Sequence, residues 1–166
     1  MADEGGGEAP KMWSIVVALA RLFGVSMALR VFGFKRFYMA LNRRATRIAA
    51  RRATRAQTAS VALDAPCVQA GTLDEARRTT ALVVLANRHY SPIEARCLVE
   101  SMTLWWTLLR RGIGADLQLG VRTFVGPLQS HSWVEYQGVP LNDSENVGRV
   151  FETFDLSEIS TDLKAP

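Results

Sequence analysis

Three side chains in the second half of the chain have the types and the order needed for nucleophilic catalysis. Cys97 lies near the start of an apolar segment, and His131 follows 34 residues later at the start of a strand-like segment. Asp143 comes third, after a further strand-like segment. A thiol attacks as the thiolate, so it needs a base to take its proton and benefits from a carboxylate that orients that base. The spacing therefore predicts Cys97 as nucleophile, His131 as base and Asp143 as the orienting group.

Each of these residues also has an ordinary structural interpretation, and only their conjunction favours catalysis. A lone free cysteine is commonly a small buried hydrophobe. His89 is the other histidine of the sequence and is a less favoured base, while Cys67 is interpreted as an incidental apolar residue. For the oxyanion hole we expect the Cys97 backbone N–H and a second donor, for which Gln69 is a candidate by residue type alone.

Helical segments should carry the thiol. Leu73 to His89 has a largely apolar helical stripe, and Ser91 to Glu94 forms a capping-box pattern with proline at the first helical position. A helix that began there would leave Cys97 in its second turn, so we expect a break between Pro92 and Ala95 and a new helix start close to the thiol. That helix should end at Arg111, where Gly112 can adopt a left-handed conformation.

After Gly112 the hydrophobic period changes to two. Apolar residues alternate from Leu117 to Val121, and strands are expected over residues 130–137, 139–142 and 150–154. The pair Gln137-Gly138 is typical of a hairpin turn. Helices followed by an antiparallel sheet predict an α+β fold.

The N-terminal part differs from the rest in composition. Residues 1–9 are interpreted as a tail, and Met12 to Phe34 is strongly apolar but carries Arg21 and Arg30, which disfavours a simple transmembrane anchor. We interpret it as one or two helices that pack on the catalytic unit or on a partner. A linker is expected from Thr58 to Gly71, so we divide the chain into an N-terminal helical segment, 1–63, and a catalytic domain, 64–166.

Charge is divided in the same way. Residues 10–63 contain 11 Lys and Arg and no acid, whereas residues 64–166 contain 9 Lys and Arg against 13 Asp and Glu. The basic segment is interpreted as a solvated face or a dock for an acidic protein. Contact with an anionic membrane surface is less favoured, and no nucleic-acid partner is expected.

Other chemistries have no pattern in the sequence. No metal-binding or glycine-rich phosphate motif is present, so we expect no metal and no cofactor. Two cysteines do not make a disulfide framework, and no convincing cleavage site for secretion is seen. We therefore expect a cytoplasmic protein, at most peripheral to the membrane.

Five short segments resemble, in order and at compatible spacings, the leader peptidases of lasso-peptide biosynthesis in bacteria. These enzymes are transglutaminase-like cysteine proteases of papain-like fold. The likeness covers roughly residues 91–155, whereas the N-terminal third is similar only in character. The segments are Arg96 to Ser101, Leu108 to Ile113, Gly120 to Arg122, His131 to Glu135 and Leu141 to Ser144.

The resemblance implies a function and partners. It implies that Cys97, His131 and Asp143 remove the leader from a ribosomally made precursor peptide. It further implies two partner proteins, a separate winged-helix protein that recognises the leader and an ATP-dependent cyclase. Apolar residues between Met12 and Leu41 would be contacts for the first of these. Two alternatives stay open: a transglutaminase-like acyl transferase, and a non-catalytic peptide-binding module.

Overall fold

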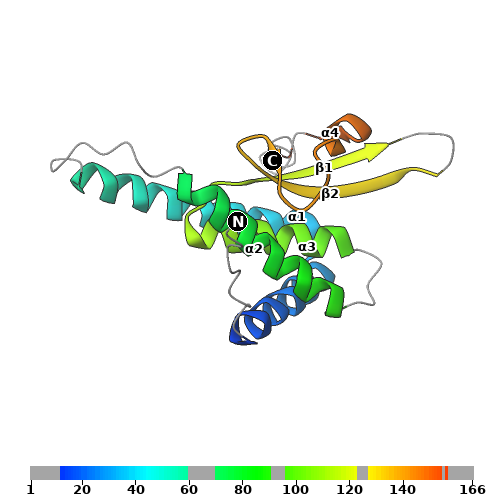
Figure 1. The fold of residues 1–166 in the computed structure, drawn as a ribbon, viewed down its shortest axis with the longest axis horizontal. Helices are drawn as coiled ribbons and strands as arrows, with labels where there is room; N and C mark the ends of the chain where they lie inside the picture. Colours follow the sequence, from blue (N-terminus) through cyan, green and yellow to red (C-terminus); the bar gives the residue numbers. More distant parts are fainter. Residues whose placement is uncertain (1–11, 60–69, 91–95, 123–126, 155, 157–166) are drawn as a thin grey trace, which may run out of the picture.

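The computed structural model describes residues 12–59, 70–90, 96–122, 127–154 and 156 (Figure 1). It contains helices and an antiparallel sheet, which confirms the predicted α+β class. The helices are α1 (Met12–Ala59), α2 (Ala70–Tyr90), α3 (Arg96–Arg111) and α4 (Val147–Val150). The strands are β1 (Asp116–Arg122), β2 (Gln129–Tyr136), β3 (Val139–Pro140) and β4 (Glu152–Thr153).

The helix α1 is longer than the sequence indicated. It reaches Ala59, and α2 already begins at Ala70, so the linker predicted from Thr58 to Gly71 is wrong at both of its ends. Its middle, residues 60–69, and the predicted tail lie outside the described residues. Within α1 the helix is interrupted at Gly33, where φ is 72° and ψ is 164°. A positive φ is available to glycine without steric cost, so Gly33 separates two helical halves.

The ends of α3 follow from local sequence. It begins at Arg96, so Cys97 lies in its first turn, while the break predicted between Pro92 and Ala95 lies outside the described residues. At the other end Gly112 has a φ of 84°. The N–H groups of Gly112 and Ile113 donate to the carbonyls of Leu109 and Leu108, both at 3.0 Å. This pattern is a Schellman motif, as the glycine predicted. The capping box at 91–94 lies outside the described residues.

The sheet is antiparallel with strand order β3-β2-β1-β4. Gln137 and Gly138 both have positive φ and form the predicted tight turn between β2 and β3. The strand β3 ends at Pro140, earlier than the predicted Asn142, because the Val134 N–H is taken by the side chain of Asn142 and does not continue the ladder with a β3 carbonyl. Leu141 still donates its N–H to the Val134 carbonyl at 2.8 Å.

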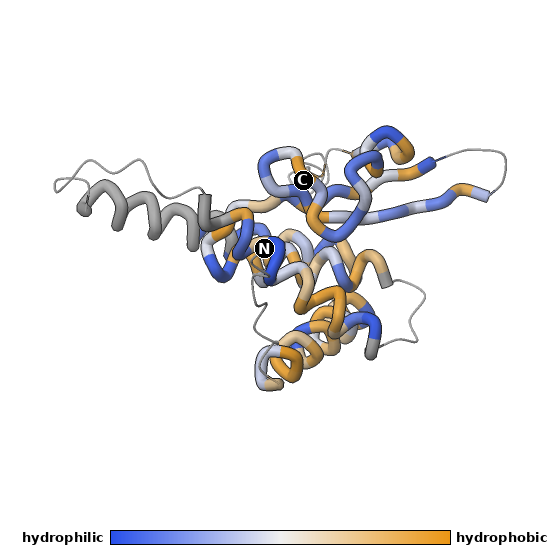
Figure 2. Tube along the Cα trace, viewed as in Figure 1, coloured by the Kyte–Doolittle hydropathy of each residue, from blue (hydrophilic) through white to orange (hydrophobic). Residues whose placement is uncertain are grey.

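The helix α3 lies at the centre of the molecule and contacts α1, α2 and the sheet. Its buried Trp105 stacks on Tyr38 of α1, with ring centroids 5.5 Å apart, and donates its indole N–H to the Ala115 carbonyl at 2.9 Å. Figure 1 shows the sheet on one side of the helices and the first half of α1 on the opposite side. Figure 2 shows that this first half is hydrophobic along most of its length, while the strands are mixed.

Candidate active site

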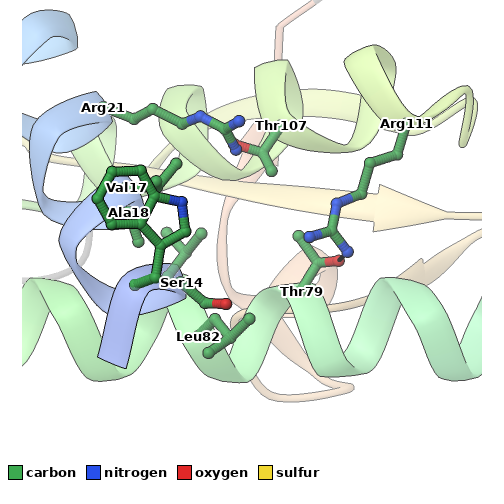
Figure 3. Close-up of a pocket in the computed structure, with 10 residues that line it drawn as sticks. Ser14, Val17, Ala18, Arg21, Thr79, Leu82, Thr107 and Arg111 are labelled. Atoms are coloured by element: carbon green, nitrogen blue, oxygen red, sulfur yellow. Dashed lines mark hydrogen bonds between the residues drawn. The ribbon is translucent and has the colours of Figure 1, made fainter. Parts of the chain in front are cut away.

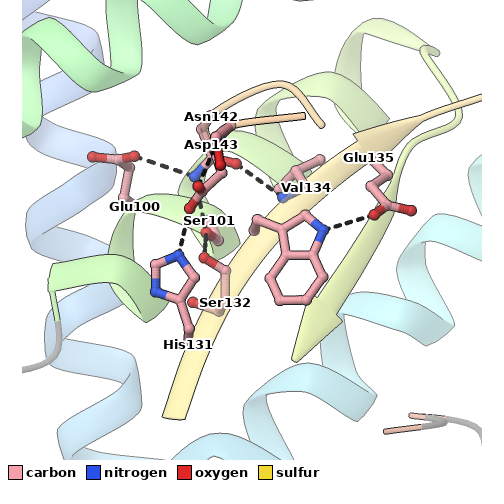
Figure 4. Close-up of polar contacts among 10 residues, drawn as sticks. Glu100, Ser101, His131, Ser132, Val134, Glu135, Asn142 and Asp143 are labelled. Carbon is pink, nitrogen blue, oxygen red and sulfur yellow. Dashed lines mark hydrogen bonds and ion pairs between the residues drawn. The ribbon is translucent and has the colours of Figure 1, made fainter. Parts of the chain in front are cut away.

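His131 and Asp143 are brought together. His131 is the third residue of β2, and Asp143 lies in the turn that follows β3. The Nε2 atom of His131 is hydrogen-bonded to Oδ2 of Asp143 (Figure 4), and both side chains are about three-quarters buried. The other oxygen of Asp143 accepts the Ser144 N–H at 2.7 Å. Because an ionised carboxylate only accepts hydrogen bonds, this contact holds the ring proton on Nε2 and leaves Nδ1 available as a base.

The imidazole is held by aromatic rings. It stacks on Trp133, two residues along β2, with ring centroids 6.1 Å apart, and it also contacts Phe151, 5.0 Å away. Gly120 lies directly opposite His131 on β1. A Cβ there would be 2.8 Å from Cβ of Phe151 and 3.1 Å from the Trp133 ring, so only glycine allows this packing. The rings thus limit the orientations that His131 can adopt.

Two residues next to the imidazole have defined contacts. Trp133 is fully buried and donates its indole N–H to Glu135 at 2.7 Å, so it is a packing residue. Arg122 places its guanidinium 5.2 Å from the centre of the Phe151 ring, on the same side of the sheet as the imidazole.

Cys97 is a free, partly buried thiol in the first turn of α3. Ser101, four residues later on the same helix face, donates its hydroxyl to the Ser132 carbonyl at 2.9 Å. Ser132 directly follows His131, so α3 is attached to β2 one helical turn away from the thiol. Among the described residues the Cys97 thiol makes no hydrogen bond.

A polar network connects the segments that carry these three residues, and the sequence did not predict it (Figure 4). Asn142, which precedes Asp143, accepts the Val134 N–H at 2.9 Å and donates to Ser101 at 3.0 Å and to Glu100 at 3.2 Å. Glu100 in turn accepts a hydrogen bond from Asn87 of α2 at 2.6 Å. The side chain of Asn142 therefore satisfies the Val134 N–H in place of a backbone carbonyl of β3.

Part of this network could have been found from the sequence. Glu100, Ser101 and Asn142 all lie inside the short segments that carried the resemblance. Asn87 lies on a different helix, and no pattern in the sequence marked it. His89 and Gln69, the other candidate residues, have no described side chains.

The structure also has a hollow far from the imidazole. A cavity of about 210 Å³ lies between α1, α2 and α3 (Figure 3). Arg21 donates to Thr107 across it at 3.3 Å, and Arg111 donates to Thr79 at 2.8 Å. Burial, together with the nearby charges of Arg110 and Arg111, lowers the pKa of Arg21. Within the described ranges no group of three or more His, Cys, Asp or Glu side chains could hold a metal ion.

Comparison with known proteins identifies the family. Residues 28–154 match the family described as transglutaminase-like superfamily, so the chain belongs to that superfamily. One relative is the microcin J25-processing protein McjB of Escherichia coli, which is 42% identical over 59 residues. That match covers 36% of this chain and 27% of the relative's length. No solved structure matches the chain significantly.

Proposed function

We propose that this protein is a cysteine peptidase that removes the leader from a ribosomally made lasso-peptide precursor. The observation that carries the proposal is the His131–Asp143 pair on a sheet to which α3, with Cys97 in its first turn, is attached. Membership of the transglutaminase-like superfamily and the likeness to a microcin-processing protein support a processing role. We further propose that the protein acts in the cytoplasm together with a leader-recognition protein and an ATP-dependent cyclase.

The proposed reaction uses the geometry as follows. Nδ1 of His131 takes the thiol proton, and the thiolate of Cys97 attacks the scissile carbonyl carbon, whose oxygen becomes an oxyanion. Collapse of that intermediate breaks the C–N bond, and the imidazolium returns its proton to the leaving amine, which is the new N-terminus of the core peptide. Water, deprotonated by the same imidazole, then hydrolyses the thioester and frees the leader carboxylate. Throughout, Asp143 stabilises the imidazolium and keeps it in orientation.

The test is to incubate the full chain with a lasso precursor and a leader-binding protein and to weigh the products by mass spectrometry. Hydrolysis yields two fragments whose masses sum to the precursor plus one water. The Cys97→Ala variant should yield none, whereas Cys67→Ala, which removes the other thiol, should cleave like wild type.

Other outcomes would replace the proposal. A mass gain when an amine is added would indicate an acyl transferase. An uncleaved precursor that wild type and the Cys97→Ala variant bind equally would indicate a binding module. Full cleavage by the Cys97→Ala variant would show that Cys97 is not the nucleophile.

A further inference from the structure

The first half of α1 has two apolar faces, and only one is covered by protein. The inner face packs on α2 and α3, with Leu22 fully buried and Val25 nearly so. On the outer side, large apolar side chains are exposed, most of them in one stripe, and Trp13, which is 75% exposed, lies at the edge of that stripe beside the cavity between α1, α2 and α3. The exposed members are Met12, Trp13, Val16, Phe23, Met27, Val31 and Phe32.

Polar groups are scarce on this outer face. Of the exposed residues between Met12 and Gly33, Arg30 is the one that carries a charge. The solvent side of an ordinary surface helix is polar, and apolar patches of this kind mark interaction sites. The stretch Met12–Arg44 is also long and apolar enough to satisfy the composition of a membrane-crossing helix.

Charge indicates what covers the stripe. Residues 10–63 carry 11 basic residues and no acid, so two copies joined through this face would bring like charges together. A protein partner would be expected to exchange about one hydrogen bond per 100–200 Å² of interface, and this stripe offers almost no donors or acceptors. An acyl-chain surface requires none, while anionic headgroups attract the exposed arginines beyond the stripe. Those arginines are Arg36, Arg43, Arg44 and Arg47.

We propose that the outer face of α1 binds the surface of an anionic lipid bilayer, with the helix lying in the plane of the membrane. Crossing the bilayer would require Leu22 and Val25 to leave their packing on α2 and α3, so an interfacial position fits the fold better. Arg21 points inward to Thr107 and stays out of the lipid, while Arg30 can extend its charge to the headgroups. The sheet lies on the opposite side of the helices and would face the cytoplasm (Figure 1).

Vesicle binding by the purified full chain tests this inference without reference to catalysis. Sedimentation with vesicles of phosphatidylcholine and phosphatidylglycerol in equal parts should retain the protein, and phosphatidylcholine alone or added salt should retain much less. Val31→Glu should lower the partition coefficient roughly tenfold or more, because a charge on the lipid face costs more than about 1.4 kcal/mol. Leu128→Glu is the matched control, since Leu128 is 66% and Val31 65% exposed.

A second measurement does not depend on a destabilising variant. Lipids with brominated acyl chains should quench the fluorescence of wild type and not that of Trp13→Phe, since the other tryptophans are buried or half-buried. The inference fails if neither vesicle type retains the protein, if Val31→Glu and Leu128→Glu bind alike, or if Trp13 is not quenched. It also fails if the chain dimerises without lipid and Val31→Glu is monomeric, or if a leader-binding protein covers the stripe in place of vesicles.

Discussion

The two faces of the helical layer differ in their polar groups: one pairs them in a hydrogen-bond network, and the other has very few. Where α3 meets β2, partly buried polar atoms are paired across four segments of chain, from Asn87 through Glu100 and Asn142 to Val134. On the outer face of α1, apolar side chains are exposed and polar groups are few. The first region fixes a geometry, because a buried polar group that loses its partner costs about 1–3 kcal/mol. The outer face of α1 has very few such polar groups and fixes no geometry, as expected for a face that contacts the fluid surface of a lipid bilayer.

Hydropathy alone does not distinguish these regions. Both α1 and α3 are rich in apolar residues, but α3 is covered on several sides, whereas α1 is covered on one. The comparison therefore predicts that substitutions near β2 will alter catalysis sharply, and that substitutions on outer α1 will leave it unchanged.

The largest effect is expected at Asp143. Asp143→Asn removes the charge that stabilises the imidazolium and no longer enforces the tautomer with a free Nδ1, so kcat should fall on the order of 10⁴-fold. Cleavage rates under saturating precursor measure this, and circular dichroism should show an intact fold. Glu145→Gln, which neutralises an exposed acid two residues away, is the matched control. An Asp143→Asn rate within tenfold of wild type would contradict the assignment.

Asn142 should have the next largest effect, although it touches no reacting atom. Asn142→Ala leaves the Val134 N–H, the Ser101 hydroxyl and a Glu100 oxygen without this partner and frees the segment that holds Asp143. A displacement of about 1 Å can reduce a rate on the order of 10²-fold, so kcat should fall by that factor with little change in KM. The exposed Asn146, as Asn146→Ala, is the control. An equal loss of kcat in both variants would show that the hydrogen-bond network of Asn142 does not position Asp143.

The same comparison shows what the sequence could and could not predict. The Schellman end at Gly112 and the Gln137-Gly138 turn were predictable because each depends on a few adjacent residues. The contact between Glu100 and Asn142 spans 42 residues, so only the folded chain brings the two together. The length of β3 depended on the Asn142 side chain, which takes the Val134 N–H and so ends a strand that hydropathy extended to Asn142.

In the candidate site, too, some features could be predicted from the sequence and others depend on the folded chain. Residue type and order singled out His131 and Asp143, and the structure pairs them, while the catalytic roles of Cys97, His131 and Asp143 stay predictions. Which side of α1 is left uncovered could not be read from the sequence. It depends on how α2 and α3 pack against that helix.

Two buried serines at the contact between α3 and β2 should differ in their effect on stability. The Ser101 hydroxyl donates to the Ser132 carbonyl and accepts from Asn142, while the Ser132 hydroxyl has no partner in the described part of the chain. Ser101→Ala should therefore cost about 1–3 kcal/mol, and Ser132→Ala should leave the free energy of unfolding unchanged or slightly higher. Urea denaturation of both variants measures the difference. A larger loss of unfolding free energy in Ser132→Ala than in Ser101→Ala would mean that the Ser132 hydroxyl contributes more to stability.

The smallest effect is expected on outer α1, at Gly24. A Cβ there meets nothing within 4 Å, and the residue lies inside a helix, where glycine is less favourable than alanine. Gly24→Ala should therefore raise the free energy of unfolding by about 0.5–1 kcal/mol and leave cleavage unchanged. The same substitution at Gly120 should have the opposite sign, because its Cβ would overlap Phe151 beside the imidazole. Thermal denaturation of the two variants compares the regions directly, and a loss of stability in Gly24→Ala would show that outer α1 is packed more closely than the exposed stripe indicates.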